Sequence, residues 1–179
     1  MRILSACKRC IPLLVLACLP GLLTVPLIRA QASAQTSILT PADVAKMMPA
    51  TVFFRGQIAS VQIRNTYGVR FPGGALVLAG LVDSSGYSSG LKTKYQGYLL
   101  SELPLVIDGK TLLAGAYGFG FLAKNDFVVM DLGGHDLLRV ASQTDAALKR
   151  PRPLRIAPGK DSGTFRLYEG RSFVSLRRK

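Results

Sequence analysis

The chain has 179 residues and a formal net charge of +13, with one histidine and three cysteines. One histidine excludes a histidine-rich metal centre within a single copy of the chain, and no motif predicts a cofactor or a bound metal, so we expect neither. The length suits one ordinary domain, which can bury enough apolar surface to fold without disulfides.

The first 34 residues have the layout of a secretory signal peptide. A positive head between Arg2 and Arg9 precedes the segment 11–28, which is apolar apart from one threonine, and small residues offer processing sites at Ala32 and Ala34. Cleavage would remove all three cysteines. We therefore expect a secreted or periplasmic protein whose mature part, residues 35–179, is a single β-rich domain.

Two alternatives to a cleaved signal remain open. The apolar run is at the short limit of an uncleaved membrane anchor, although its prolines make a poor continuous helix. Val15–Cys18 also resembles a lipobox, which would place a lipid on Cys18. Apolar residues continue to Ile28, however, where a lipoprotein usually has a polar tether.

Charge is unevenly distributed after the signal. Residues 35–148 contain nine basic and eight acidic residues, whereas residues 149–179 contain ten basic residues against only Asp161 and Glu169. A basic end of this kind indicates an anionic partner. Because we expect export, an anionic lipid, glycan or cell-wall polymer is favoured over nucleic acid, with any membrane association peripheral.

The first expected element is a short helix that begins after Thr40. Thr40 can cap the helix, Pro41 suits its first position, and Asp43 can accept a hydrogen bond from the cap. Pro49 ends it.

Segments rich in β-branched and aromatic residues follow the helix. We predict strands over 51–63, 69–71, 75–82, 95–101 and 105–107. The run 75–82 is apolar without alternation, which indicates a strand buried on both faces or in a sandwich core. A turn is expected at Asn65–Gly68 and a polar loop at 83–90.

Asp108-Gly109 is the strongest local signal, because this pair between short apolar runs favours the positive φ angles of a type I′ hairpin. Further hairpins are expected at Lys124–Asp126 and Glu169-Gly170. Residues 107–117, Ile107-Asp-Gly-Lys-Thr-Leu-Leu-Ala-Gly-Ala-Tyr117, resemble an L-x-A-G-x-Y hairpin of several secreted bacterial β-sandwich domains of unknown function. The resemblance implies a sandwich and no particular activity.

A second helix is expected from Ser142, where Ser142-Gln-Thr-Asp145 fits a capping box, to Pro151. The proline-rich segment 150–158 then predicts an extended connector or an edge strand. Short strands separated by turns at roughly 8–12-residue intervals predict an all-β fold. We expect a mostly antiparallel sandwich with a short N-terminal helix, or alternatively a small barrel.

Residues 115–121 (GAYGFGF) are an unusual aromatic and glycine repeat. On a strand, Tyr117, Phe119 and Phe121 share one face while glycines leave the other nearly bare. The aromatic rings could line a ligand cavity or fill the core. We favour the core, because a bent strand can use its glycines for close packing.

The basic end, residues 149–179, supplies the main binding hypothesis. Arg166 and Tyr168 are two positions apart on one predicted strand and so share a face, as do Arg171 and Phe173 on the partner strand. This hairpin could therefore present several guanidinium groups on one face. The alternative is a solvated edge hairpin whose charge prevents aggregation. The candidate binding residues are Arg150, Arg152, Arg155, Arg166, Arg171, Arg177, Arg178 and Lys179.

His135 is the only candidate imidazole base, and a nearby carboxylate, for which Asp136 is a candidate, could orient it and raise its pKa. A small extracytoplasmic hydrolase is therefore the alternative function. No nucleophile motif accompanies the pair, so a non-enzymatic binding or envelope-associated protein is the leading hypothesis.

The signal-peptide hypothesis predicts where the exported protein begins. N-terminal sequencing of that material should start at Ser33 or Gln35. An intact Met1 would instead indicate an anchor, and a lipid-modified Cys18 a lipoprotein.

Overall fold

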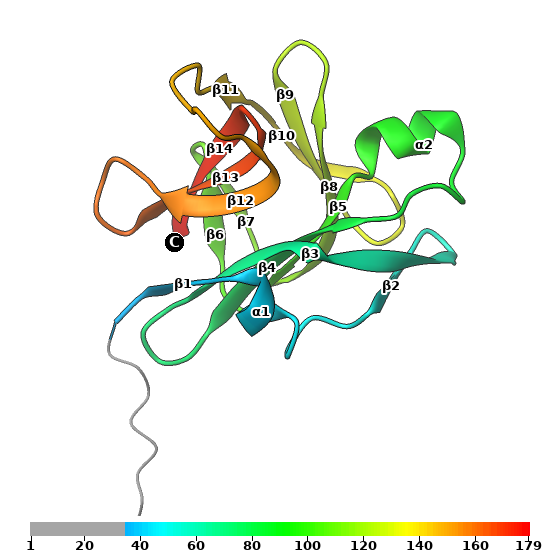
Figure 1. Ribbon diagram of the computed structural model, residues 1–179. Coiled ribbons are helices and arrows are strands. Elements are labelled where there is room, and N and C mark those ends of the chain that lie inside the picture. Colours follow the sequence, from blue (N-terminus) through cyan, green and yellow to red (C-terminus); the bar gives the residue numbers. More distant parts are fainter. Residues whose placement is uncertain (1–34) are drawn as a thin grey trace, which may run out of the picture. The chain divides into compact units, whose positions relative to one another are not determined.

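The structure is a computed structural model that describes residues 35–179, and the signal-peptide prediction lies outside these residues. Within them, antiparallel strands form two sheets that pack as a β-sandwich, as the sequence predicts, and the sheets do not close into a barrel (Figure 1). Two short helices complete the fold, α1 (Pro41–Val44) and α2 (Ser89–Lys94).

The larger sheet has eight strands. They are β1 (Ser37–Leu39), β2 (Thr51–Phe54), β3 (Gln57–Arg70), β4 (Leu76–Val82), β5 (Gly97–Ser101), β8 (Gly115–Leu122), β9 (Asp126–Met130) and β10 (Asp136–Ala141). Their order is β1-β3-β4-β5-β8-β9-β10, with β2 paired to β3.

The smaller sheet has six strands. They are β6 (Leu105–Ile107), β7 (Lys110–Leu112), β11 (Gln143–Thr144), β12 (Arg152–Pro158), β13 (Thr164–Gly170) and β14 (Ser172–Arg178). Their order is β12-β13-β14-β6-β7, with β11 paired to β14. Three strands, β13, β14 and β6, therefore lie inside this sheet, whereas β12 forms one edge.

The main core lies between the two sheets. Val77, Phe119 and Phe127 contribute from the larger sheet, and Leu167 and Leu176 from the smaller one, all at most 1% exposed. Burying each such side chain contributes roughly 1.5–3 kcal/mol. Successive residues of a strand point to opposite faces, so the neighbours of Leu167 and Leu176 point outward from the sandwich.

The larger sheet is also covered on its second face. There α1, the β2–β3 hairpin and the segment around α2 enclose a second apolar cluster, which receives Leu78 and Val82 from β4. The prediction of a strand buried on both faces is thus confirmed for β4. The rings of Phe54 and Tyr95 stack in this layer with their centroids 3.7 Å apart, and burial raises the pKa of the Tyr95 hydroxyl.

Two glycines of β8 make this second layer fit. A Cβ atom on Gly118 would lie 2.5 Å from the ring of Phe54, and one on Gly120 would collide with the backbone oxygen of Lys94. The glycines predicted to leave one strand face bare therefore allow the Phe54 ring and the end of α2 to pack directly on the backbone of the sheet.

Several local predictions are confirmed. The Thr40 backbone N–H donates to the Asp43 carboxylate at 3.0 Å, as in a capping box, and the Thr40 hydroxyl donates to the same carboxylate at 2.7 Å. Asp108 and Gly109 have φ angles of 40° and 87° between paired Ile107 and Lys110, as a type I′ turn requires. The C-terminal hairpin also forms, with its turn one residue later than predicted, at Gly170-Arg171.

The predicted turn at Asn65–Gly68 is wrong. These residues lie within β3, whose register against β4 shifts between Val61 and Thr66. The Thr66 hydroxyl donates to the Ile63 carbonyl at 2.7 Å, so local hydrogen bonds support a bulge rather than a chain reversal. The reversal occurs earlier, at Arg55-Gly56, where both φ angles are positive.

The second predicted helix is also wrong. Gln143–Thr144 forms β11, which pairs with β14. Asp145, expected to cap a helix, instead accepts a hydrogen bond from the Tyr168 hydroxyl at 3.1 Å and lies 3.9 Å from Arg166. A helix does occur at Ser89–Lys94, where none was expected, and its first two residues belong to the predicted polar loop.

The positive φ of Gly109 predicts a specific cost of substitution. No atom lies within 4 Å of a Cβ placed on this glycine, so Gly109→Ala should lower the free energy of unfolding by about 1–2 kcal/mol through backbone strain alone. Urea denaturation would measure the difference.

Gly90→Ala is the matched control, because Gly90 is equally uncrowded but lies in α2 without a positive φ. Alanine there should be neutral or stabilising, by up to about 1 kcal/mol. Equal effects of the two variants would contradict the assigned turn.

Candidate functional site

Three of the candidate arginines share the outward face of the smaller sheet. Arg155, Arg166 and Arg177 lie on the adjacent strands β12, β13 and β14, and each alternates with residues of the main core. Arg155 pairs with Tyr168, and Arg177 pairs with Thr164. Each of these partners is two residues from Arg166, so the arginines form a diagonal row with neighbours roughly 7–8 Å apart. We call this row the arginine diagonal.

The central arginine of the diagonal is held in place. The guanidinium of Arg166 lies over the ring of Phe173, with its carbon 4.4 Å from the ring centroid. Its Nη1 donates to the Tyr168 hydroxyl at 3.2 Å and lies 3.9 Å from an Asp145 oxygen. The side chain is only 19% exposed, so Arg166 has a structural role as well as a charge.

The two outer arginines of the diagonal are less constrained. Arg177 is exposed, and its Nη1 donates to the Arg178 carbonyl at 3.4 Å. Arg155 is half-buried, and within residues 35–179 its guanidinium has neither a hydrogen bond nor an ion pair. Most of their donor groups are therefore available to a ligand.

The remaining candidates do not join the diagonal. Nη1 of Arg152 donates to the Tyr67 hydroxyl at 2.6 Å, which links the smaller sheet to β3. Arg171 donates to the carbonyls of Ala146 and Leu148 and so fixes the loop after β11. The other candidates outside the diagonal, all of them exposed, are Arg150, Arg178 and Lys179.

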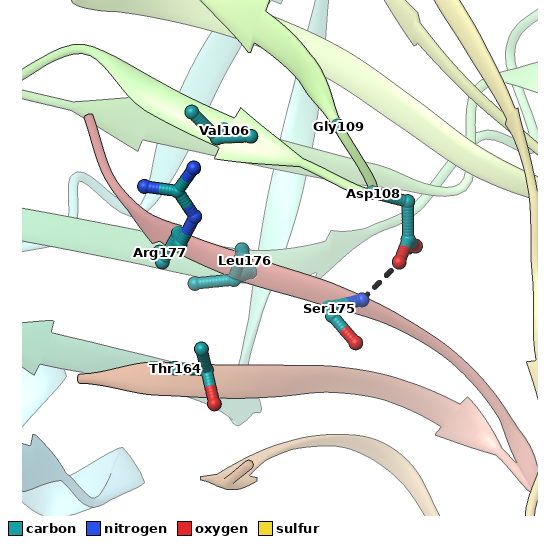
Figure 2. Close-up of a pocket in the computed structure, with 7 residues that line it drawn as sticks. All are labelled: Val106, Asp108, Gly109, Thr164, Ser175, Leu176 and Arg177. Atoms are coloured by element: carbon teal, nitrogen blue, oxygen red, sulfur yellow. Dashed lines mark hydrogen bonds between the residues drawn. The ribbon is translucent and has the colours of Figure 1, made fainter. Parts of the chain in front are cut away.

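A pocket of about 270 Å³ lies beside Arg177 (Figure 2). Its walls are the Asp108-Gly109 turn and Val106 on one side and Thr164 on the other, with Ser175 and Arg177 of β14 between them. The side chain of Ser175, on β14 between the two walls, is short and therefore leaves space in the pocket. Sequence reasoning missed this pocket, since it joins residues separated by more than fifty positions.

Asp108 is fixed at one end of the pocket. Its carboxylate accepts a hydrogen bond from the Ser175 backbone N–H at 3.1 Å, drawn in Figure 2, and its own backbone N–H donates to the Ser175 carbonyl at 3.0 Å. Desolvation raises the pKa of the Asp108 carboxyl. The pocket thus has a carboxylate at one end and a guanidinium at the other.

The carboxylate that His135 contacts is not the adjacent Asp136. Nδ1 of His135 lies 3.0 Å from an Asp131 oxygen instead, and hydrogen bonds from His135 lower the pKa of that carboxyl. Asp136 is held by Lys94 at 2.9 Å and by Arg139 at 3.1 Å. The imidazole is 81% exposed, so the pair has no enclosed site in which to act on a substrate.

The aromatic residues of β8 lie in the main core. Phe119 is fully buried, and Tyr117 and Phe121 are 8% exposed. The ring of Phe121 is 4.7 Å from that of Phe127, and the Tyr117 hydroxyl donates to the Leu113 carbonyl at 3.0 Å. These residues therefore pack the sandwich.

Glu169 is a titratable group that the sequence did not single out. It is two residues after Leu167 on β13, so both side chains are on the inward face of the strand. Desolvation there raises the pKa of the Glu169 carboxyl to about 7. Its position beside the turn gave no sequence signal of burial.

Comparison with known proteins gives no further assignment, because no family model, curated protein or solved structure matches the chain. Among residues 35–179 there is no helix that could span a membrane, and no group of three metal-ligating side chains.

Glu169 predicts a pH-dependent stability. The folded protein retains the Glu169 proton up to about pH 7, whereas the unfolded chain releases it near the ordinary value of 4.5. The stability is therefore full below pH 4.5 and declines as the pH rises through 7. As the pH rises from 4.5 to 8, the free energy of unfolding of Glu169→Gln should increase by about 1–3 kcal/mol relative to that of the native chain.

Denaturant unfolding at a series of pH values would measure this difference, with the exposed Asp161→Asn as a charge-matched control. A pH-independent difference between native protein and Glu169→Gln would show that Glu169 is solvated.

Proposed function

We propose that this chain is an exported, non-enzymatic binding protein that holds an anionic polymer or membrane surface against the outward face of its smaller sheet. The arginine diagonal carries the proposal. It sets three guanidinium groups on adjacent strands, in the part of the chain where basic residues most exceed acidic ones. Guanidinium groups suit phosphates and carboxylates, because their planar donors can bind two oxygens at once.

Edge protection does not account for this arrangement. Charged side chains often guard exposed sheet edges against aggregation, but β13 and β14 lie inside the smaller sheet. The outward charges of Arg166 and Arg177 therefore guard no edge. Arg155 lies on the edge strand β12 beside Pro153, so its charge serves protection there as well.

An open face of this kind favours a surface or polymer over a single small molecule. Each exposed arginine contributes a modest, screened attraction, so the affinity arises from several contacts together. Screening acts over about 8 Å at physiological ionic strength, similar to the spacing along the diagonal.

Binding should therefore weaken steeply with salt. We expect the protein to bind immobilised acidic glycan or anionic lipid vesicles at low ionic strength and to release them as sodium chloride increases. Arg155→Gln and Arg177→Gln should each reduce the affinity by about twofold to fivefold, with unchanged thermal stability. Arg166 is left intact because it packs against Phe173 and Asp145.

Lys46→Gln with Lys92→Gln provides the matched control. Both lysines are exposed and lie in the α1 and α2 regions. Substituting both removes the same total charge as substituting Arg155 and Arg177. Equal losses in this variant and in a variant that combines Arg155→Gln with Arg177→Gln would mean that net charge alone drives binding. Absence of binding at low salt would refute the proposal, and an activity abolished by His135→Ala would favour the hydrolase instead.

A further inference from the structure

The pocket beside Arg177 combines three kinds of recognition group. Arg177 supplies a cation, Asp108 supplies a carboxylate, and Ser175 supplies a hydroxyl group. Binding pockets commonly use a few fixed polar groups of this sort to orient a ligand on otherwise apolar walls.

Arg177 fits a planar anion at one end of the pocket. Its guanidinium has five N–H donors, of which the long contact to the Arg178 carbonyl occupies only one. The side chain reaches toward Val106, its cross-strand partner, at the upper side of the pocket in Figure 2. A carboxylate lying here can accept two parallel hydrogen bonds.

Asp108 fits hydroxyl groups at the other end. A carboxylate has about four acceptor positions, and the Ser175 N–H occupies one of them. The Thr164 hydroxyl donates to the Asp161 carbonyl at 2.6 Å and points away from the pocket, so Thr164 presents its methyl group there (Figure 2). The free acceptor positions of Asp108 therefore suit a ligand that carries hydroxyl groups.

Asp108 also selects against highly charged anions. A phosphate dianion bound to Arg177 would lie in the same small pocket as the Asp108 carboxylate and would be repelled by it. A monoanion with neutral hydroxyl groups avoids most of this repulsion and gains hydrogen bonds from the same carboxylate.

The size and rigidity of the pocket favour one compact ring. Its volume of about 270 Å³ is at the lower end for ligand sites. Strand pairing fixes Ser175 and Arg177, and the Asp108-Gly109 turn is set by its positive φ angles. Such a preformed site loses little conformational entropy on binding. Val106 adds an apolar wall for the C–H face of a ring.

We propose that this pocket binds a single uronic-acid unit of an acidic glycan, with the sugar carboxylate on Arg177 and the ring hydroxyls on Asp108 and Ser175. This inference rests on the proposed function and narrows its anionic partner to a carboxylated glycan. The arginine diagonal then provides the additional charge contacts along the polymer.

The test titrates the full protein with glucuronate, with glucose and with inorganic phosphate at matched ionic strength. Backbone amide NMR should show saturable shifts for glucuronate at Asp108, Gly109 and Ser175–Arg177. We expect glucose and phosphate each to bind at least about tenfold more weakly, because each lacks one of the two polar recognition elements.

Two variants separate the pocket from the general charge of the face. Arg177→Gln should weaken glucuronate binding about tenfold, whereas Arg178→Gln, an adjacent exposed arginine on the opposite face of β14, should leave it unchanged. Asp108→Asn keeps a turn-compatible residue and an acceptor for Ser175, and should reduce the preference for glucuronate over phosphate.

The inference is overturned if phosphate binds as tightly as glucuronate, if the two arginine variants behave alike, or if no pocket amide shifts. Glycan polymers and anionic vesicles would then still report on the proposed function. Salt-dependent retention of the polymer without pocket shifts refutes the uronate site alone, whereas absence of retention refutes both.

Discussion

Burial of the larger sheet on both faces is the constraint on which the rest of the structure depends. One face packs against the smaller sheet, and the other packs against α1, the β2–β3 hairpin and the segment around α2. Every position of β4 after Leu76 is consequently buried. The same constraint requires glycine at 118 and 120, since a side chain at either position would collide with the second layer.

This double burial also determines where polar function can lie. Both faces of the larger sheet are covered by packing. Within residues 35–179, the sheet face that remains accessible is therefore the outward face of the smaller sheet. Part of that face is occupied by a small cluster of Ala157, Tyr168 and Phe173 under Leu148. The open remainder, toward β6 and the Asp108-Gly109 turn, contains Arg177 and the pocket.

The sequence predicted those features that local chemistry determines. The fold class follows from short β-rich segments and frequent turns, the first helix from its capping box, and the Asp108-Gly109 hairpin from the φ angles these residues accept. The failed helix after Ser142 shows the limit. Asp145 of its predicted capping box instead interacts with Tyr168 and Arg166, more than twenty positions away. A local sequence pattern cannot identify such distant partners.

The candidate site was predictable only in part, for the same reason. Strand alternation correctly placed Arg166 and Tyr168 on one face, but it could not show that Arg171 would bind loop carbonyls or that Arg152 would reach Tyr67. The pocket depends on the pairing of β14 with both β13 and β6. That pairing is a property of the sheet order, which local sequence patterns do not specify.

The distribution of acidic partners explains why the charge of the basic end remains available. In α2 and the larger sheet, Lys94 and Arg139 are paired with Asp136. Among the acids of residues 149–179, Glu169 is desolvated and its raised pKa leaves its carboxyl partly protonated near neutral pH. Asp145 lies beside the central arginine of the diagonal and not beside its outer members. Arg155 and Arg177 therefore keep a positive charge that an external anion can satisfy.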